Sequence, residues 1–146
     1  MDKISAQRRS ANMARIRSKN TAPEVILRSL IHRLGYRFRL HRTDLPGRPD
    51  LVFSSRRKII LVHGCFWHQH PGCPEGRIPN SRPEYWVSKL KRNQIRDDTN
   101  CAFLKDQGWQ ILIVWECELK DIAAVTKAVK KFLGNAGPAS GVNLRR

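Results

Sequence analysis

The stretch DLVFSSRRKIILVH, residues 50–63, decides how this chain folds. It holds two short apolar runs separated by the polar residues SSRR at 54–57. Short runs rich in branched and aromatic residues, divided by polar turn residues, are typical of two antiparallel strands in a hairpin. We therefore expect strands at 50–53 and 58–63, and a further strand at 36–41, where YRFRLH alternates apolar and polar residues.

A second branched run, WQILIVWE at 109–116, predicts a fourth strand. A long helix is predicted between it and the hairpin, from the capping-box spacing of Ser81-Arg-Pro-Glu84 to about Gln107. A strand–helix–strand crossover is right-handed and makes its two strands parallel neighbours. The apolar positions expected on this helix are Trp86, Leu90, Ile95 and Leu104.

Two further helices complete the expected fold. The first begins at the capping-box spacing of Thr21-Ala-Pro-Glu24 and stops at Gly35, and the last spans about 120–133 and ends at Gly134. The fold class is therefore α/β, with a mixed sheet flanked by helices in one domain at 21–134. A basic arm at 1–20 precedes this domain, and a flexible tail at 135–146 follows it. The apolar stripe expected on the first helix is Ile26, Leu27, Leu30, Ile31 and Leu34.

The charge of the chain indicates its partner. Lys and Arg number 28 against 12 Asp and Glu, which gives a formal net charge of +16. Such a charge favours a polyanion, and nucleic acid is the first choice, with a basic ribosomal or membrane-surface protein as the alternative. No secretory leader and no apolar run of about 20 residues is present, so we expect a cytoplasmic protein without a membrane span.

The segment HGCFWHQHPGC, residues 63–73, indicates a structural zinc site. It supplies three candidate ligands, Cys65, His70 and Cys73, and structural zinc takes four. Cys117 is the expected fourth ligand. Cys65 and Cys117 each follow one of the two strands expected to be parallel neighbours, at the same offset from the apolar run. Cys101 is interpreted as a small core residue. The alternative is a loop of buried thiols without metal.

A second group of residues indicates phosphodiester hydrolysis. Asp50 follows Gly-Arg-Pro at the start of a strand, where a carboxylate can hold Mg²⁺. His63 closes the partner strand and His68 follows in the loop, so that a histidine can move a proton while the metal polarises a phosphoryl oxygen. The alternative for Asp50 alone is a turn residue bonded to its own backbone.

Four strings together resemble the very short patch repair mismatch endonucleases of bacteria, from about Met13 to Leu119. They are GRPD at 47–50, HGCFWH at 63–68, EYW at 84–86 and GWQILIVWEC at 108–117. The resemblance implies a restriction-endonuclease-like core, in the order helix, three strands, helix, strand.

The resemblance also implies a role for each residue of the catalytic group. Asp50 and the main-chain carbonyl of Val62 would bind Mg²⁺, and Glu24 would reach the water shell of the metal. His68 would act as general base or acid, assisted by His63.

Further roles implied by the resemblance concern DNA. Phe66, Trp67 and Trp86 would insert beside the mismatched pair, while the N-terminal arm around Met13 would grip the other groove. The family nicks one strand 5′ to the thymine of a T:G mismatch in a cytosine-methyltransferase site. The expected partners are double-stranded DNA with a T:G mismatch and other mismatch-repair proteins, and we expect a monomer.

Several residues keep a structural interpretation beside the catalytic one. Glu24 fits a capping box, Trp86 fits a helix core, and His32 and His41 are expected at the surface. The strand at 58–63 lacks the acidic-x-Lys triplet of many restriction-type nucleases. Two other functions stay open: a restriction- or homing-type endonuclease on paired DNA, and a non-catalytic zinc-stabilised DNA-binding module.

Overall fold

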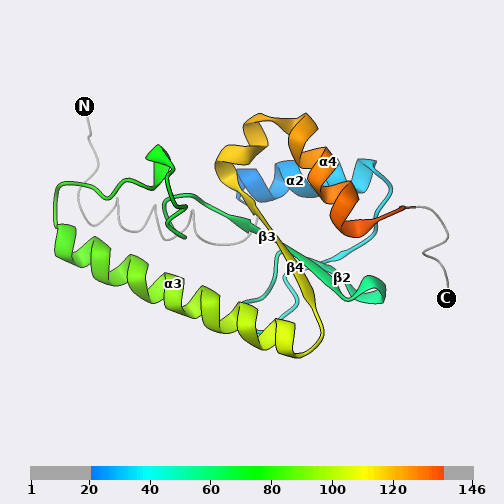
Figure 1. Ribbon diagram of the computed structural model, residues 1–146, viewed down its shortest axis with the longest axis horizontal. Coiled ribbons are helices and arrows are strands. Elements are labelled where there is room, and N and C mark those ends of the chain that lie inside the picture. The colour runs from blue at the N-terminus through cyan, green and yellow to red at the C-terminus, as the bar shows by residue number, and fades with distance from the viewer. Residues whose placement is uncertain (1–20, 137–146) are drawn as a thin grey trace.

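The computed structural model, which describes residues 21–136, has an α/β fold built on one mixed sheet (Figure 1). The strands lie in the order β1-β2-β3-β4. The first three are antiparallel neighbours, and β4 pairs parallel to β3. The strands predicted at 50–53, 58–63 and 109–116 are thereby confirmed, together with the hairpin and the parallel crossover. The bounds are β1 Arg39–Leu40, β2 Leu51–Phe53, β3 Lys58–His63 and β4 Gln110–Trp115.

Helices cover both faces of this sheet. α2 and α4 pack on one face and α3 crosses the other (Figure 1). Alternation along the strands makes this possible, because Ile60 packs in the cluster with α2 and α4 while its neighbour Ile59 packs with Leu104 of α3. The bounds are α2 Ala22–Arg33, α3 Pro83–Asp106 and α4 Ile122–Leu133, with a short turn of helix, η3, at Glu116–Lys120.

Two helices begin close to the predicted positions, but the capping hydrogen bonds predicted for them are not observed. α2 does begin after Thr21 with a proline in its first turn, but no side chain caps it. α3 begins at Pro83 after Arg82, which has a φ of 53°, and no side chain caps it either. The two predicted capping boxes are therefore wrong. Glu24 is instead turned toward His41, so its carboxylate is used outside its own helix.

The apolar stripes are correct in their centres and wrong at two positions. Leu27, Leu30 and Ile31 of α2 are buried as predicted, whereas Ile26 is 47% exposed. Along α3, Leu90 and Leu104 are buried, but Ile95 is 54% exposed. Ile95 lies between Leu90 and Leu104 along α3, but at 3.6 residues per turn it is about 140° and about 180° around the helix from them, so it faces solvent.

The strand predicted at 36–41 is much shorter than expected. Only Arg39 and Leu40 pair with β2, and both are exposed. Tyr36 turns into the core, where its hydroxyl donates to the carbonyl of Gly134 after α4. His41 ends the strand in a left-handed conformation with φ 46°.

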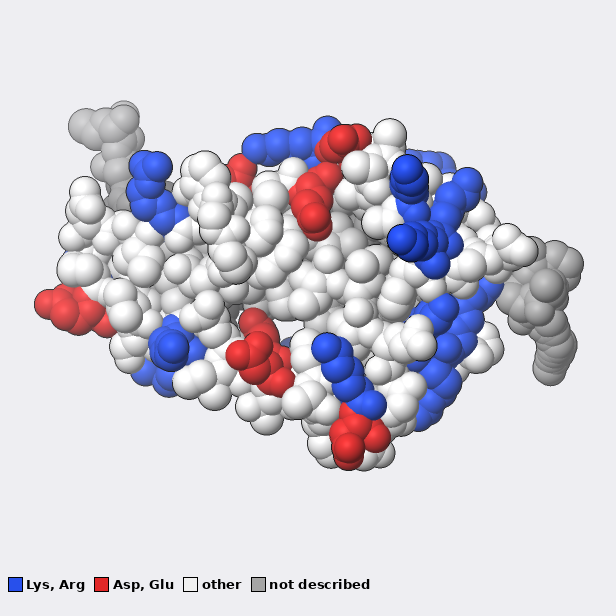
Figure 2. Space-filling model, viewed as in Figure 1, with Lys and Arg blue, Asp and Glu red and all other residues white. Residues whose placement is uncertain are grey.

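Basic residues in the β2–β3 turn and at the start of β3 donate hydrogen bonds to the ends of two helices. Arg56 and Lys58 donate to the carbonyls of Leu133 and Phe132 at the end of α4, at 3.2 and 2.6 Å. Arg57 donates to Gln107 after α3. Cations at a helix C-terminus satisfy orphan carbonyls and complement the helix dipole. Figure 2 shows lysine and arginine side chains gathered at this end of the molecule.

The arm predicted at 1–20, with Met13, and most of the tail at 135–146 lie outside the described residues. No helix of the described chain is long and apolar enough to cross a membrane.

Candidate active site and metal-binding loop

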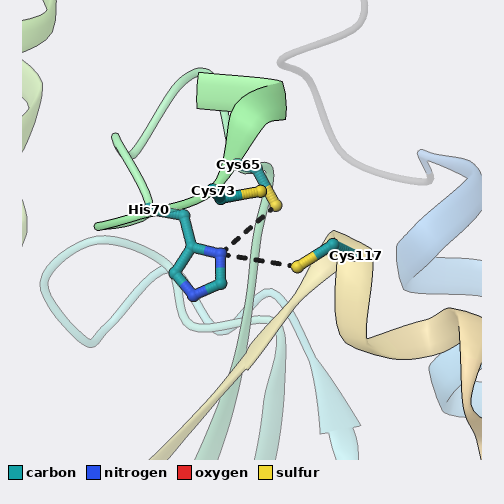
Figure 3. A group of neighbouring side chains, drawn as sticks. All are labelled: Cys65, His70, Cys73 and Cys117. Carbon is teal, nitrogen blue, oxygen red and sulfur yellow. Dashed lines mark hydrogen bonds between the residues drawn. The ribbon is translucent and has the colours of Figure 1, made fainter. Parts of the chain in front are cut away.

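The parallel pairing of β3 and β4 brings four predicted ligands together at one edge of the sheet. His63 lies opposite Trp115 in this pairing, so the positions of Cys65 and Cys117 correspond just beyond the strands. The four potential ligand atoms all lie within 4.8 Å of one another (Figure 3). They belong to Cys65, His70, Cys73 and Cys117. His70 Nδ1 is 3.7 Å from Cys65 Sγ and 3.4 Å from Cys117 Sγ.

Tight turns and one ring contact fix this loop. The amide of His70 donates to the carbonyl of Cys65 at 2.9 Å, and that of Cys73 donates to His70 at 3.2 Å. The ring of His70 stacks on Trp115 of β4 with centroids 4.1 Å apart. A Cβ at Gly76 would lie 3.3 Å from the carbonyl oxygen of Cys65, so the loop closes tightly there.

The donor set of this loop fits a tetrahedral soft-metal site. Three sulfurs and one imidazole nitrogen converge, which is a set that structural zinc takes. Burial raises the pKa of the Cys65 thiol to about 12, and a bound cation would displace that proton. Cys101 lies outside the group, as predicted, but it is half-buried and lines the neighbouring cavity instead of the core.

A cavity of about 740 Å³ opens beside this loop and contains every described residue predicted to be catalytic. The start of α2, the connection between β1 and β2, the end of β3 with the loop after it, and the middle of α3 all contribute to its wall. The predicted residues in its lining are Glu24, Asp50, Val62, His63 and His68.

Asp50 is held by the backbone of the neighbouring strand. The amide of Val62 donates to Asp50 Oδ2 at 2.8 Å. Burial raises the pKa of Asp50 from 3.8 to about 6, the hydrogen bond from Val62 opposes that rise, and the nearby charge of Glu24 adds to it. A buried carboxylate with a raised pKa gains from a cation that neutralises it.

His41, which the sequence did not indicate as a site residue, lies close to both Glu24 and Asp50. His41 Nε2 lies 3.0 Å from Glu24 Oε1, and one ligand atom from each of the three residues lies within 4.8 Å of the others. The side chain of His41 is only 16% exposed. The prediction of a surface histidine is therefore wrong, because the chain turns at the end of β1 and brings His41 inward.

His63 and His68 form a stacked pair. Their ring centroids are 3.8 Å apart with an angle of 7° between the planes. His63 is 7% exposed, and its Nδ1 has no hydrogen-bond partner among the described residues. Burial and the neighbouring His68 lower the pKa of His63 to about 4.

A second residue missed by the sequence analysis is Asp97 of α3. Its Oδ2 lies 2.5 Å from His68 Nδ1. The available signal was its place on the α3 face that also carries Cys101 and Leu104, one and two turns further on. Only the packing of α3 against the loop decides that this carboxylate meets His68.

The aromatic residues predicted to probe DNA form one cluster. Phe66 contacts Trp67 and Trp86 edge-on, with centroids 5.0 and 5.3 Å apart. All three are half-buried, and Asn93 donates to the carbonyl of Trp67 at 3.4 Å. The expected outward pair is thus braced by Trp86, because the three rings shield one another from water.

Carboxylates and imidazoles grouped around an open cavity are typical of an enzyme that uses acid–base chemistry. The family described as DNA mismatch endonuclease Vsr matches residues 1–73. The chain is 51% identical to the type II nicking enzyme V.XorIIP of Xanthomonas oryzae pv. oryzae, over 90% of this chain and 96% of that protein. It is 44% identical to the DNA mismatch endonuclease Vsr of Escherichia coli, over 92% and 89%. The type II nicking enzyme V.NmeAIP of Neisseria meningitidis is 36% identical, over 90% and 94%. The chain therefore belongs to the Vsr family of DNA mismatch endonucleases.

The raised pKa of Asp50 predicts that this carboxylate destabilises the cation-free fold. Because folding raises the pKa, its favourable contribution is complete below about pH 4 and is lost as the pH rises through about 6. We expect Asp50→Asn to raise the free energy of unfolding by about 1–3 kcal/mol near neutral pH, since one pKa unit equals about 1.4 kcal/mol. Urea denaturation without added divalent cation measures this.

The matched control for that substitution is Asp98→Asn, which alters an exposed carboxylate on α3. It should leave the stability unchanged within about 0.5 kcal/mol. The gain from Asp50→Asn should shrink as the pH falls through about 6 and vanish well below 3.8, where Asp50 is protonated in both the folded and the unfolded wild type. A gain of equal size at neutral and acid pH would contradict the assignment.

Proposed function

We propose that this protein is an endonuclease that nicks one strand of duplex DNA 5′ to the thymine of a T:G mismatch, with Mg²⁺ bound at Asp50. One observation carries the proposal: the cavity that holds Asp50 and the His63–His68 pair is also lined by Phe66 and Trp67. Family membership supports the mismatch endonuclease reaction. We also infer a restriction-endonuclease-like core, since helix, three strands, helix and strand follow in the order that the resemblance implies.

The residues present fit a divalent cation. Two carboxylates, Asp50 and Glu24, lie close together in a cavity, and carboxylate oxygens are preferred ligands of Mg²⁺. The main-chain carbonyl of Val62 would be a further ligand. When bound, the cation would polarise a phosphoryl oxygen and stabilise the charge that develops there.

Proton transfer would be the task of the stacked histidines. The contact with Asp97 occupies Nδ1 of His68, which leaves Nε2 for a water molecule or a leaving oxygen. Asp97 would hold the ring in place and stabilise its protonated form. His63, kept neutral by its lowered pKa, would let His68 gain a proton without facing a second positive ring.

The aromatic cluster would supply selectivity for mismatches. Insertion of a wedge into a base stack costs a few kcal/mol per step, and a mismatched step costs less to open than a paired one. Bracing by Trp86 would lower the entropy that Phe66 and Trp67 lose on insertion. The net charge of +16 would supply attraction to phosphate that does not depend on sequence.

The metal-binding loop would hold zinc in a structural role. Its four ligands fill the tetrahedral positions and leave none for a reacting water molecule. The same loop carries His68 and the two aromatic residues between its ligands. Zinc would therefore keep both the proton-transfer group and the wedge in position.

A nicking assay tests the reaction. End-labelled T:G and fully paired duplexes are incubated with and without Mg²⁺, for the wild type and Asp50→Ala. We expect cleavage of the thymine strand of the T:G duplex alone, and a loss of about a thousandfold in Asp50→Ala, because a metal-stabilised charge is worth several kcal/mol. Asp44→Ala removes an exposed carboxylate from the same connection and should retain activity.

Other results of this assay would contradict the proposal in different ways. Equal cutting of both duplexes would indicate a restriction- or homing-type enzyme. Tight binding without cutting would indicate a DNA-binding module. Full activity in Asp50→Ala would remove the metal from that residue.

Elemental analysis tests the zinc loop. We expect about one zinc per chain in purified wild type, little in Cys117→Ser, and the full amount in Cys101→Ser, since only Cys117 belongs to the four-ligand group. Loss of zinc should also lower the melting temperature, because metal binding is coupled to folding of the loop. Wild-type protein with reduced thiols and no zinc would refute this assignment.

The wedge is tested by changing both loop aromatics to alanine. Phe66→Ala with Trp67→Ala should weaken binding to T:G duplex by about ten- to a hundredfold, since base–aromatic stacking is worth about 1–3 kcal/mol. Binding to paired duplex should change far less, because phosphate contacts are blind to sequence. Phe103→Ala, at an aromatic residue 50% exposed on α3, is the control. Equal losses on both duplexes would argue against insertion.

A further inference from the structure

A third side chain stands with the two carboxylates proposed to hold the cation. Glu24 lies in the first turn of α2, His41 directly after β1, and Asp50 directly before β2. One potential ligand atom from each lies within 4.8 Å of the other two. All three line the active-site cavity. Three segments that are separate in sequence therefore converge at one point.

The separation between two of these atoms suits a shared cation. Bonds of about 2.1 Å at right angles, as in an octahedral site, place neighbouring ligand atoms about 3 Å apart. His41 Nε2 and Glu24 Oε1 are 3.0 Å apart. The same separation suits a hydrogen bond, so these two atoms can stay about 3 Å apart whether they share a proton or a cation.

The backbone fixes His41 relative to Asp50. The amide of His41 donates to the carbonyl of Asp50 at 3.4 Å, next to the pairing of Leu40 with Leu51. His41 has a φ of 46°, a conformation that residues other than glycine rarely adopt and that gathers at functional sites. An extended residue here would prolong β1; the left-handed turn ends the strand and brings the imidazole to the carboxylates.

A second histidine of the cavity wall, His63, has a buried ring nitrogen that is not hydrogen-bonded within the described residues. This atom is Nδ1. Such atoms are rare in folded proteins, and a catalytic role, a water molecule or an ion can account for them. His63 therefore has one buried ring nitrogen that no group of the described residues satisfies.

The nature of the donor atoms sets the preference between metals. Mg²⁺ takes oxygen ligands almost exclusively, whereas imidazole suits transition metals, and Mn²⁺ accepts carboxylate, water and imidazole. We propose that His41 is a third side-chain ligand of that cation, and that this mixed nitrogen–oxygen site binds Mn²⁺ more tightly than Mg²⁺. This inference rests on the divalent-cation site proposed at Asp50.

Direct Mn²⁺ binding to the full-length protein without DNA tests this. Free Mn²⁺ is followed by electron paramagnetic resonance, and Mg²⁺ affinity by competition. His41→Gln should weaken Mn²⁺ binding by about tenfold while Mg²⁺ binding changes by less than about threefold, because only Mn²⁺ gains from nitrogen. Glutamine keeps an N–H donor for Glu24. If His41 only held Glu24 in place, His41→Gln would therefore leave Mn²⁺ affinity unchanged. His32→Gln, at an exposed histidine of α2, is the control.

Pulsed electron paramagnetic resonance of bound Mn²⁺ provides a second measurement. The wild type should show coupling to an imidazole nitrogen, and His41→Gln should lose it. Persistent coupling, or unchanged Mn²⁺ affinity in His41→Gln, would overturn the assignment. Wild type that binds no Mn²⁺ at about millimolar concentration would overturn it too, because the three side chains are already assembled. Mn²⁺ binding that survives Asp50→Ala would instead refute the proposed site at Asp50.

Discussion

The parallel pairing of β3 with β4 is the interaction on which the rest of the site depends. These strands are joined by α3, and their pairing places His63 opposite Trp115. Two groups of side chains then meet at this edge of the sheet. One is the four potential zinc ligands, and the other is His68 with its partner Asp97 of α3. A shift of one residue in the pairing would turn each side chain of β4 to the opposite face. The metal-binding loop would then lose Cys117.

The loop that carries Cys65, His70 and Cys73 also lines the cavity proposed as the active site. Residues 65–73 close on a group of three sulfurs and one nitrogen, while the residues between them carry the imidazole and the aromatic rings that face the cavity. A loop without such a closure would have to be ordered by its own packing, which is thin here because most of its residues are exposed or half-buried. Metal binding would replace that missing packing.

Positive charge has two different uses in this chain. Part of it is structural, because Arg56, Arg57 and Lys58 bind carbonyls at the ends of α3 and α4. These contacts join the hairpin to helices on both faces of the sheet. Two further cations, Arg42 and Lys120, are paired with the carboxylates of Asp44 and Glu75. Net charge alone therefore overstates how many cations can contact phosphate.

The sequence by itself predicted three of the strands, their parallel crossover, the four cysteine and histidine residues that converge, and the cavity residues Asp50, His63 and His68. Each of these is marked by a short local pattern. Branched runs specify strands, and a strand–helix–strand order fixes their handedness. Only the tertiary structure decided that His41 and Asp97 belong to the site. Neither is marked locally: His41 turns inward through a left-handed residue, and Asp97 meets His68 only because α3 packs against the loop. The capping boxes failed for a related reason, since a carboxylate such as Glu24 can bind a distant partner in place of its own helix, and local spacing does not contain that partner.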